Sequence, residues 1–277
     1  MPTARSSPTQ SPAIEVFAWQ GFSIEHPADF APATITGARA EGYVRLASAG
    51  KLSIQIRWKR SKKPNDLLPS LKEYLAKLER DAKRAKVPFR SEFDREDGRI
   101  VYRYTGVGQG RGNLFFSEDC SRVFFLEVIG GRKDALLPAY RHATAGFQSN
   151  GSRTSERWSV LGLSFRVPGC MTVDKKLFLA GRTELTLRGR HARVLGSRWA
   201  FGNLLIEKHG FEDWARAALN LHGARVEKHE RGLSFCTPGI LRGTYTLVAE
   251  PDSNHQIVAL QASCRRPEWR PTWDWLE

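Results

Sequence analysis

The clearest pattern of hydrophobic and polar positions lies in residues 52–59, in the first half of the chain. Leu52, Ile54, Ile56 and Trp58 alternate there with polar or basic side chains. A period of two places the apolar side chains on one face of a β-strand and the others on the opposite face. The segment therefore predicts a half-buried strand with one basic face.

A helical period follows this strand, in residues 67–85. Its apolar side chains recur at steps of three and four and form one stripe: Leu68, Leu71, Leu75, Leu78, Ala82 and Ala85. That spacing predicts an amphipathic helix with a charged opposite side. Around it we expect strands at 22–27, 43–47, 89–93, 99–104, 113–117 and 122–129, and a closing helix at 135–146. Asp97-Gly98 indicates a hairpin turn.

The second half repeats this order. We expect strands at 163–167, 184–188, 194–199, 224–228, 233–236, 244–249 and 256–262, a helix at 211–221 and a short Trp-rich helix within 267–276. GFSIEHP at 21–27 and GLSFRVP at 162–168 share Gly, Ser and Pro at an offset of 141 residues. The same offset carries Arg57-Trp58 onto Arg198-Trp199. These matches predict a tandem duplication of one domain.

The predicted domain organisation follows from this repeat. Residues 1–13 are rich in Ser, Pro and Thr and are expected to form a disordered leader. A first α+β domain is predicted at 14–147 and a second at 158–277. Residues 148–157 are polar and contain Asn-Gly, which is typical of a linker.

Each unit thus consists of a strand, a hairpin, a helix, an antiparallel meander and a final helix. Together with the early G-F-S-I-x-x-P strand, the aromatic strand Val123–Ile129 and the terminal Gly146-Phe147, this order resembles the PsbP-like fold. That fold is shared by photosystem PsbP, a Ran-binding nuclear import factor, DcrB-like proteins and the Eag chaperones of type VI secretion effectors. The resemblance implies antiparallel sheets flanked by helices and a non-enzymatic binding, assembly or chaperone role. It also implies that two linked domains could cradle an effector segment.

Composition adds a strong positive charge to this picture. The 277 residues include 43 Lys and Arg against 29 Asp and Glu, a formal net charge of +14. Such a surplus favours an anionic partner, such as nucleic acid, an acidic protein or an anionic membrane surface, although a basic surface without a partner is the plain alternative. No membrane span or secretory signal is recognisable, so a cytoplasmic location is expected. Four cysteines without a CxxC pair predict free thiols.

The candidate anion- or partner-binding residues are the basic side chains on and around the strand at 52–59 and its repeat. In the first copy they are Lys51, Arg57, Lys59, Arg60, Lys62 and Lys63, and in the second Arg188, Arg190, Arg193 and Arg198. Two basic sheet faces could neutralise a phosphate backbone. An ordinary solvated sheet face is the alternative for the same residues.

Other motifs favour no specific chemistry. The glycine-rich GVGQGRG at 106–112 precedes a predicted strand rather than a helix, so it indicates a hairpin and not a phosphate loop. Histidines near residue 209 lack metal-ligand spacing, and Glu25-His26 has no counterpart in the repeat. No catalytic residue, metal or cofactor is assigned.

Three functions stay open on these grounds. The leading hypothesis is a non-enzymatic adaptor or chaperone-like protein that binds a protein partner or effector segment. The alternatives are a sequence-tolerant nucleic-acid-binding protein and an enzyme of unknown class. Oligomeric state is open, and a monomer with paired domains fits the repeat.

Overall fold

The computed structural model describes residues 13–64, 66–149, 155–169, 171–239, 242–266 and 269–277. The predicted leader therefore lies outside the described residues, apart from Ala13. The first half contains β1 (Ile14–Trp19), β2 (Phe22–Pro27), β3 (Phe30–Gly37), β4 (Glu41–Ser48), β5 (Ser53–Arg60), α1 (Leu68–Arg84), β6 (Arg90–Glu96), β7 (Arg99–Thr105), β8 (Gln109–Ser117), β9 (Arg122–Gly130), α2 (Leu136–Ala145) and β10 (Gln148–Ser149).

The second half follows the same order of strands with different helices. It contains β11 (Ser155–Val160), β12 (Leu163–Pro168), β13 (Thr172–Leu179), β14 (Arg182–Arg188), β15 (Ala192–Trp199), α3 (Gly202–Glu207), α4 (Phe211–Ala218), β16 (Arg225–His229), β17 (Gly232–Thr237), β18 (Gly243–Ala249), β19 (Ile257–Cys264) and the 3₁₀ helix η2 (Trp273–Trp275). Cys120, Cys236 and Cys264 are free thiols, as expected.

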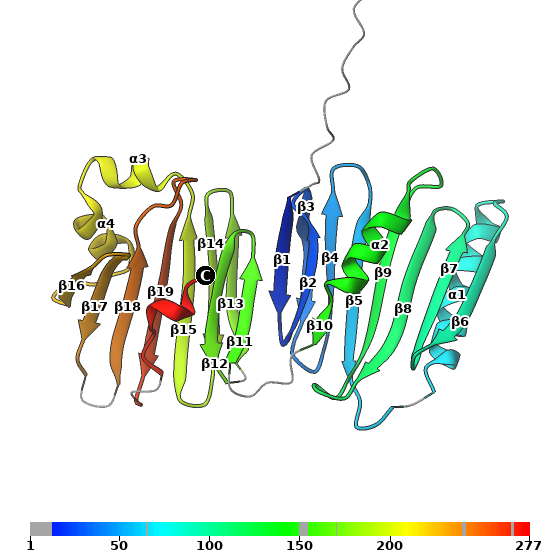
Figure 1. Ribbon diagram of the computed structural model, residues 1–277, viewed down its shortest axis with the longest axis horizontal. Coiled ribbons are helices and arrows are strands. Elements are labelled where there is room, and N and C mark those ends of the chain that lie inside the picture. Colours follow the sequence, from blue (N-terminus) through cyan, green and yellow to red (C-terminus); the bar gives the residue numbers. More distant parts are fainter. Residues whose placement is uncertain (1–12, 65, 150–154, 170, 240–241, 267–268) are drawn as a thin grey trace, which may run out of the picture.

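The strands form three antiparallel sheets, and the predicted α+β class is confirmed. The first half forms a seven-stranded sheet of order β3-β4-β5-β9-β8-β7-β6, and the second half forms one of the equivalent order β13-β14-β15-β19-β18-β17-β16. A five-stranded sheet, β10-β2-β1-β11-β12, takes strands from both halves and lies between them (Figure 1). None of the described helices is long and apolar enough to cross a membrane.

The likeness of the two halves extends to their irregularities. The register between β3 and β4 shifts between Pro32 and Thr34, and the register between β13 and β14 shifts between Val173 and Lys175. These two bulges are 141 residues apart, the offset found in the sequence. A bulge inserts one residue into one strand and is specific to its position in a sheet. The two halves therefore match residue by residue as far as β4 and β14.

After β4 and β14, the offset between equivalent residues of the two halves decreases by one. The predicted equivalence of Arg57-Trp58 and Arg198-Trp199 is therefore wrong. Ala47 pairs with Ser53 around the β4–β5 turn, whereas Arg188 pairs with Arg193 around the shorter β14–β15 turn. A shift of one residue exchanges the two faces of a strand. Trp58 accordingly packs in the core shared by the two halves, whereas Trp199 packs on the opposite face against α4. The Arg57-Trp58 and Arg198-Trp199 pairs are therefore not structural equivalents.

The two halves join around a pseudo-two-fold axis. Ala18 in β1 pairs with Ser159 in β11, and the Lys176 Nζ donates to the Ile35 carbonyl. Each pair is separated by 141 residues, so each residue contacts its own equivalent, as happens on the axis of a two-fold interface. The fully buried Trp19 and Trp158 meet there edge to face, with ring centroids 5.4 Å apart. One hydrophobic cluster consequently runs through both halves.

The predicted linker at 148–157 is partly wrong. Gln148 and Ser149 form β10, which pairs with β2, and Ser155 begins β11. Residues 150–154 lie outside the described part. The polar composition was misleading because Glu156, although charged, is buried where it pairs with Arg39 of the other half.

Helices cover only part of each large sheet. Leu71 and Leu75 of α1 are buried against Ile100, Tyr102 and Leu114 of β7 and β8. α2 lies on the other face, over β2, β8 and β9 (Figure 1). The outer part of that second face, over β6 and β7, remains accessible. This half-covered sheet carries the sites described next.

Candidate anion-binding site

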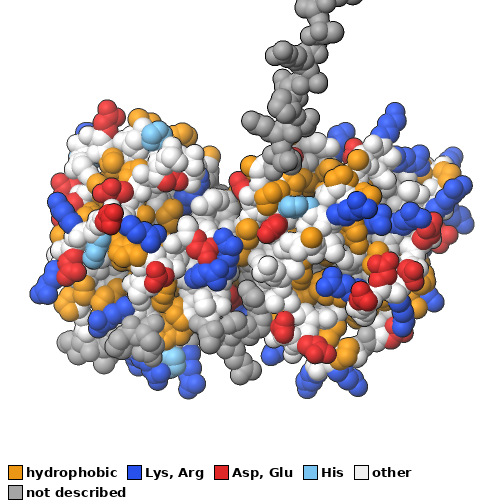
Figure 2. Space-filling model, viewed as in Figure 1, with side chains coloured by type: hydrophobic (Ala, Val, Ile, Leu, Met, Phe, Trp, Pro, Cys, Tyr) orange, Lys and Arg blue, Asp and Glu red, His pale blue; other side chains and the backbone are white. Residues whose placement is uncertain are grey.

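The predicted basic residues of the first copy do not form one patch. Lys51 lies in the β4–β5 turn, whereas Lys59, Arg60, Lys62 and Lys63 lie at and beyond the far end of β5. An eight-residue strand separates these positions by about 25 Å. The basic side chains visible in Figure 2 are likewise spread over both halves and interspersed with acidic ones.

Arg57 lies apart from the other predicted basic residues, on the outer face of β5. Its guanidinium carbon is 5.5 Å from the ring centroids of Tyr43 and Tyr74 and 5.8 Å from that of Phe125. Cations attract the faces of aromatic rings, so Arg57 is held by the protein itself. It lines a pocket of about 630 Å³ beneath α1.

The predicted residues of the second copy are also divided. Arg188 and Arg193 both pair with Asp174, at 3.7 and 3.2 Å, and Arg190 is exposed in the turn between them. Arg198 donates from Nε to Gln256 at 2.7 Å and lines a groove between the two halves. The structure therefore brings two of these four arginines, Arg188 and Arg193, together around one carboxylate.

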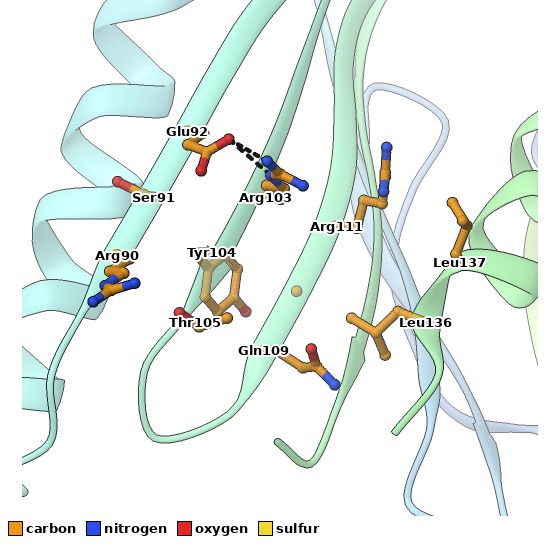
Figure 3. A pocket seen from close by; sticks show the side chains of 11 residues that line it. Arg90, Ser91, Glu92, Arg103, Tyr104, Thr105, Gln109, Arg111, Leu136 and Leu137 are labelled. Carbon is orange, nitrogen blue, oxygen red and sulfur yellow. Dashed lines mark hydrogen bonds and ion pairs between the residues drawn. The ribbon is translucent and has the colours of Figure 1, made fainter. Parts of the chain in front are cut away.

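A different set of arginines converges on the accessible face of β6, β7 and β8. Arg90, Arg103 and Arg111 line a pocket of about 420 Å³ (Figure 3). The register places Glu92, Arg103 and Arg111 side by side on the three strands. Leu136 and Leu137 at the start of α2 form the apolar rim.

The charges in this arginine pocket are not balanced. Arg103 donates from Nε and Nη2 to one oxygen of Glu92, at 2.9 and 2.5 Å. The Arg111 guanidinium lies over the ring of Tyr140, 5.0 Å from its centroid, and its buried Nε has no hydrogen-bond partner among the described residues. Three arginines against one carboxylate thus favour an anion here.

The sequence held a signal for this pocket. The predicted hairpin at Asp97-Gly98 is confirmed. A turn of these two residues pairs Glu96 with Arg99, and the same register places Glu92 opposite Arg103. The glycine-rich segment is a hairpin turn at residues 106–108, as predicted, and its Arg111 lies on β8. That Arg111 reaches the pocket depends on the β7–β8 register.

The glycines of this segment serve the opposite face of the same strands. A side chain at Gly112 would meet the Tyr102 hydroxyl, and one at Gly110 would meet the Tyr104 ring, each at 2.4 Å. The tyrosines therefore lie flat across β8. The Tyr102 hydroxyl passes over Gly112 and donates a hydrogen bond to the Glu127 carboxylate on β9, at 2.8 Å. The Tyr74 hydroxyl of α1 donates to the other oxygen of the same carboxylate, at 2.9 Å.

Glu127 is the most strongly perturbed carboxyl of this face. Burial raises its pKa to about 7, against the opposing effects of the Tyr102 and Tyr74 hydrogen bonds and of Arg57. Burial also raises the pKa of both tyrosines, so they stay protonated donors. The Tyr102–Glu127–Tyr74 cluster fixes α1 on the sheet and supports the strands that carry Arg103 and Arg111.

The other candidate groups do not converge. His26 is buried and its Nδ1 is 2.9 Å from the Pro27 carbonyl, while Glu25 faces His142 at 3.9 Å. Arg216 donates from Nε and Nη2 to one carboxylate oxygen of Glu212, at 3.0 and 2.9 Å. Among the described residues, no three His, Cys, Asp or Glu side chains are placed together as metal ligands.

Comparison with known proteins gives only a distant likeness to solved structures. No family model matches the chain, and no curated protein matches it. The solution structure of a cyanobacterial PsbP (CyanoP) from Synechocystis sp. PCC 6803 is similar at a TM-score of 0.36 and 9% identity, covering 53% of this chain and 98% of that chain. It is of the PsbP kind that the sequence resembles. At these values the likeness carries no conclusion about ligand or partner.

Proposed function

We propose that this chain is a non-enzymatic binding protein, built by tandem duplication of a PsbP-like unit, that engages an acidic protein partner through the arginine pocket. The observation that carries the proposal is the charge of the pocket, in which Arg90, Arg103 and Arg111 are balanced by one carboxylate only, that of Glu92. Arginine binds carboxylates through paired donors, which suits recognition of an Asp or Glu side chain.

The pocket also favours a particular neighbour for that carboxylate. Leu136 and Leu137 stand at its rim, and Leu137 is 37% exposed. An acidic residue followed by an apolar one would fill the arginine site and cover this leucine together. The net charge of +14 would speed the encounter with such a partner.

Calorimetric titration of the full chain with two blocked peptides tests this function. One contains Asp-Leu and the other Asn-Leu in its place. We expect the Asp peptide to bind at least about tenfold more tightly, because charge-assisted hydrogen bonds are the stronger ones. Arg111→Gln should remove this preference, whereas Lys133→Gln, an exposed change before α2, should preserve it. Equal affinity for both peptides, or an unchanged preference in Arg111→Gln, would refute the proposal.

A second candidate, nucleic-acid binding, is favoured by one observation. Lys59, Arg60, Lys62 and Lys63 are exposed and form no ion pair among the described residues. Their segment and the β14–β15 turn lie at the same lower edge of Figure 1. This candidate predicts binding to single-stranded DNA that weakens steeply with salt. In a gel-shift titration, Lys59→Glu with Lys62→Glu should abolish it, and Arg111→Gln should not.

A further inference from the structure

The pseudo-two-fold join creates two related grooves, one on each side of its axis, and one of them is closed. Arg39, in the β3–β4 turn, crosses to the second half and pairs there with Glu156 of β11. Its Nη2 also donates to the Met171 carbonyl at 3.3 Å. Glu156 is only 2% exposed as a result. The closed groove is therefore filled by a guanidinium group.

The other groove contains the equivalents of these acceptors without the guanidinium. An offset of 141 residues relates Glu156 to Glu15, Met171 to Phe30 and Arg39 to Ala180. The equivalence is structural, because Gly37 pairs with Gly42 and Phe178 pairs with Thr183, so the two turns have the same length. Alanine thus stands where arginine closes the first groove.

This second groove is open and has room for a ligand. It measures about 680 Å³ and is lined by Glu15, Phe30, Leu179 and residues of the β11–β12 turn. Glu15 is exposed, in contrast to Glu156. Two side chains at the rim, Ile14 and Leu179, are large, apolar and 44% and 58% exposed.

The cations already in the open groove are held by other partners. Arg198 donates to Gln256, and the Arg157 Nε lies 2.5 Å from a carboxylate oxygen of Glu277. Among the described residues, no cation lies within ion-pair distance of Glu15. The negative charge of Glu15 does act on Arg198 across the groove, where it opposes the lowering of the Arg198 pKa by burial. Glu15 nevertheless forms no ion pair with a described residue, so its carboxylate can pair with an incoming guanidinium.

We propose that the open groove binds an arginine side chain of a partner protein, which takes the place that Arg39 holds in the closed groove. The guanidinium would pair with Glu15 and donate to the Phe30 carbonyl. The apolar rim of Ile14 and Leu179 would cover side chains flanking that arginine. The site is distinct from the arginine pocket and does not depend on it.

The test uses the full chain and a blocked peptide, acetyl-Gly-Val-Arg-Val-Gly-amide, with its citrulline counterpart as the neutral control. Titration followed by calorimetry should give the arginine peptide at least a tenfold lower Kd, since citrulline keeps the shape and loses the charge. Glu15→Gln should abolish the difference. Glu41→Gln, an exposed carboxylate outside the groove, should leave it intact.

A second variant fills the groove from within. Ala180→Arg would supply an internal guanidinium like Arg39, and it should exclude the peptide while the thermal unfolding temperature stays the same or rises. If this variant fails to fold, Glu15→Gln decides. Equal binding of the arginine and citrulline peptides, absence of binding, or peptide binding unchanged in a folded Ala180→Arg protein would each overturn the proposal.

Discussion

At the scale of single residues, Gly112 leaves the space through which the Tyr102 hydroxyl reaches the buried carboxylate of Glu127. The hydroxyl of Tyr102 lies 2.4 Å from where a Cβ of residue 112 would stand, so Gly112→Ala must displace the tyrosine from Glu127. We expect a loss of about 1–3 kcal/mol of stability, the usual cost of overpacking a filled site. Urea unfolding measures it. Gly50→Ala, in the β4–β5 turn, is the matched control, because its added methyl group would meet only the Ser48 hydroxyl, at 3.6 Å, and its φ is not positive.

Glu127 itself predicts a pH dependence of stability. Its folded-state pKa, about 7, is above its usual value of 4.5, so the folded protein binds the proton more tightly. Stability should therefore fall as pH rises from about 4.5 to 7, by roughly 1–3 kcal/mol. Urea unfolding at pH 5 and pH 8 should show a smaller fall in Glu127→Gln than in the parent.

The control for this measurement is Glu118→Gln, which neutralises an exposed carboxylate. It should keep the full pH dependence. Part of the fall would persist in Glu127→Gln, because burial also raises the pKa of Glu156 to about 7. A pH dependence identical in Glu127→Gln and the parent would contradict the assignment.

At the scale of elements, α1 covers the Tyr102–Glu127–Tyr74 cluster and depends on its leucine stripe. Leu71 is fully buried against the sheet. Leu71→Ala should lower stability by about 2–5 kcal/mol, through lost burial and the cavity left behind. It should also expose Glu127 to water and lower its pKa, which carboxyl NMR titration would report. Lys72→Ala, on the exposed side of α1, should change neither quantity.

The sequence predicted some elements better than others, for a physical reason. β5 and α1 are each buried on one face, so a period is visible in their side chains. β1 was not predicted because Phe17, Ala18 and Trp19 are all buried in the join between the halves, which removes the alternation. Glu156 of β11 was assigned to the linker because it is charged, and the sequence does not reveal that Arg39, 117 residues away, pairs with it.

At the scale of the whole molecule, the join should be able to form between separate chains. A fragment of residues 13–149 would retain both Arg39 and Glu15, so two copies could pair β1 with β1 and form two Arg39–Glu15 pairs. We expect it to dimerise in light-scattering measurements at micromolar concentration. Arg39→Ala should weaken that dimer. A folded, strictly monomeric fragment would contradict the interpretation of the join.

The fragment of residues 155–277 provides the matched comparison. It carries Ala180 in place of an arginine, and Lys176 would meet a second Lys176 on the axis. Like charges brought together oppose association. We therefore expect this fragment to dimerise more weakly than the first, or to remain monomeric.

The sequence alone determined the amphipathic strands and the helix at 68–84, the repeat and the surplus of positive charge, because these depend on local periods and counts. Only the tertiary structure decided which face each basic residue occupies, since one residue fewer in the β14–β15 turn exchanges the faces of β15. It also decided that Arg90, Arg103 and Arg111 line one pocket, and that Arg39 closes one groove while Ala180 leaves its counterpart open. Those outcomes depend on strand register and on contacts between the two halves, which residue spacing along the chain does not encode.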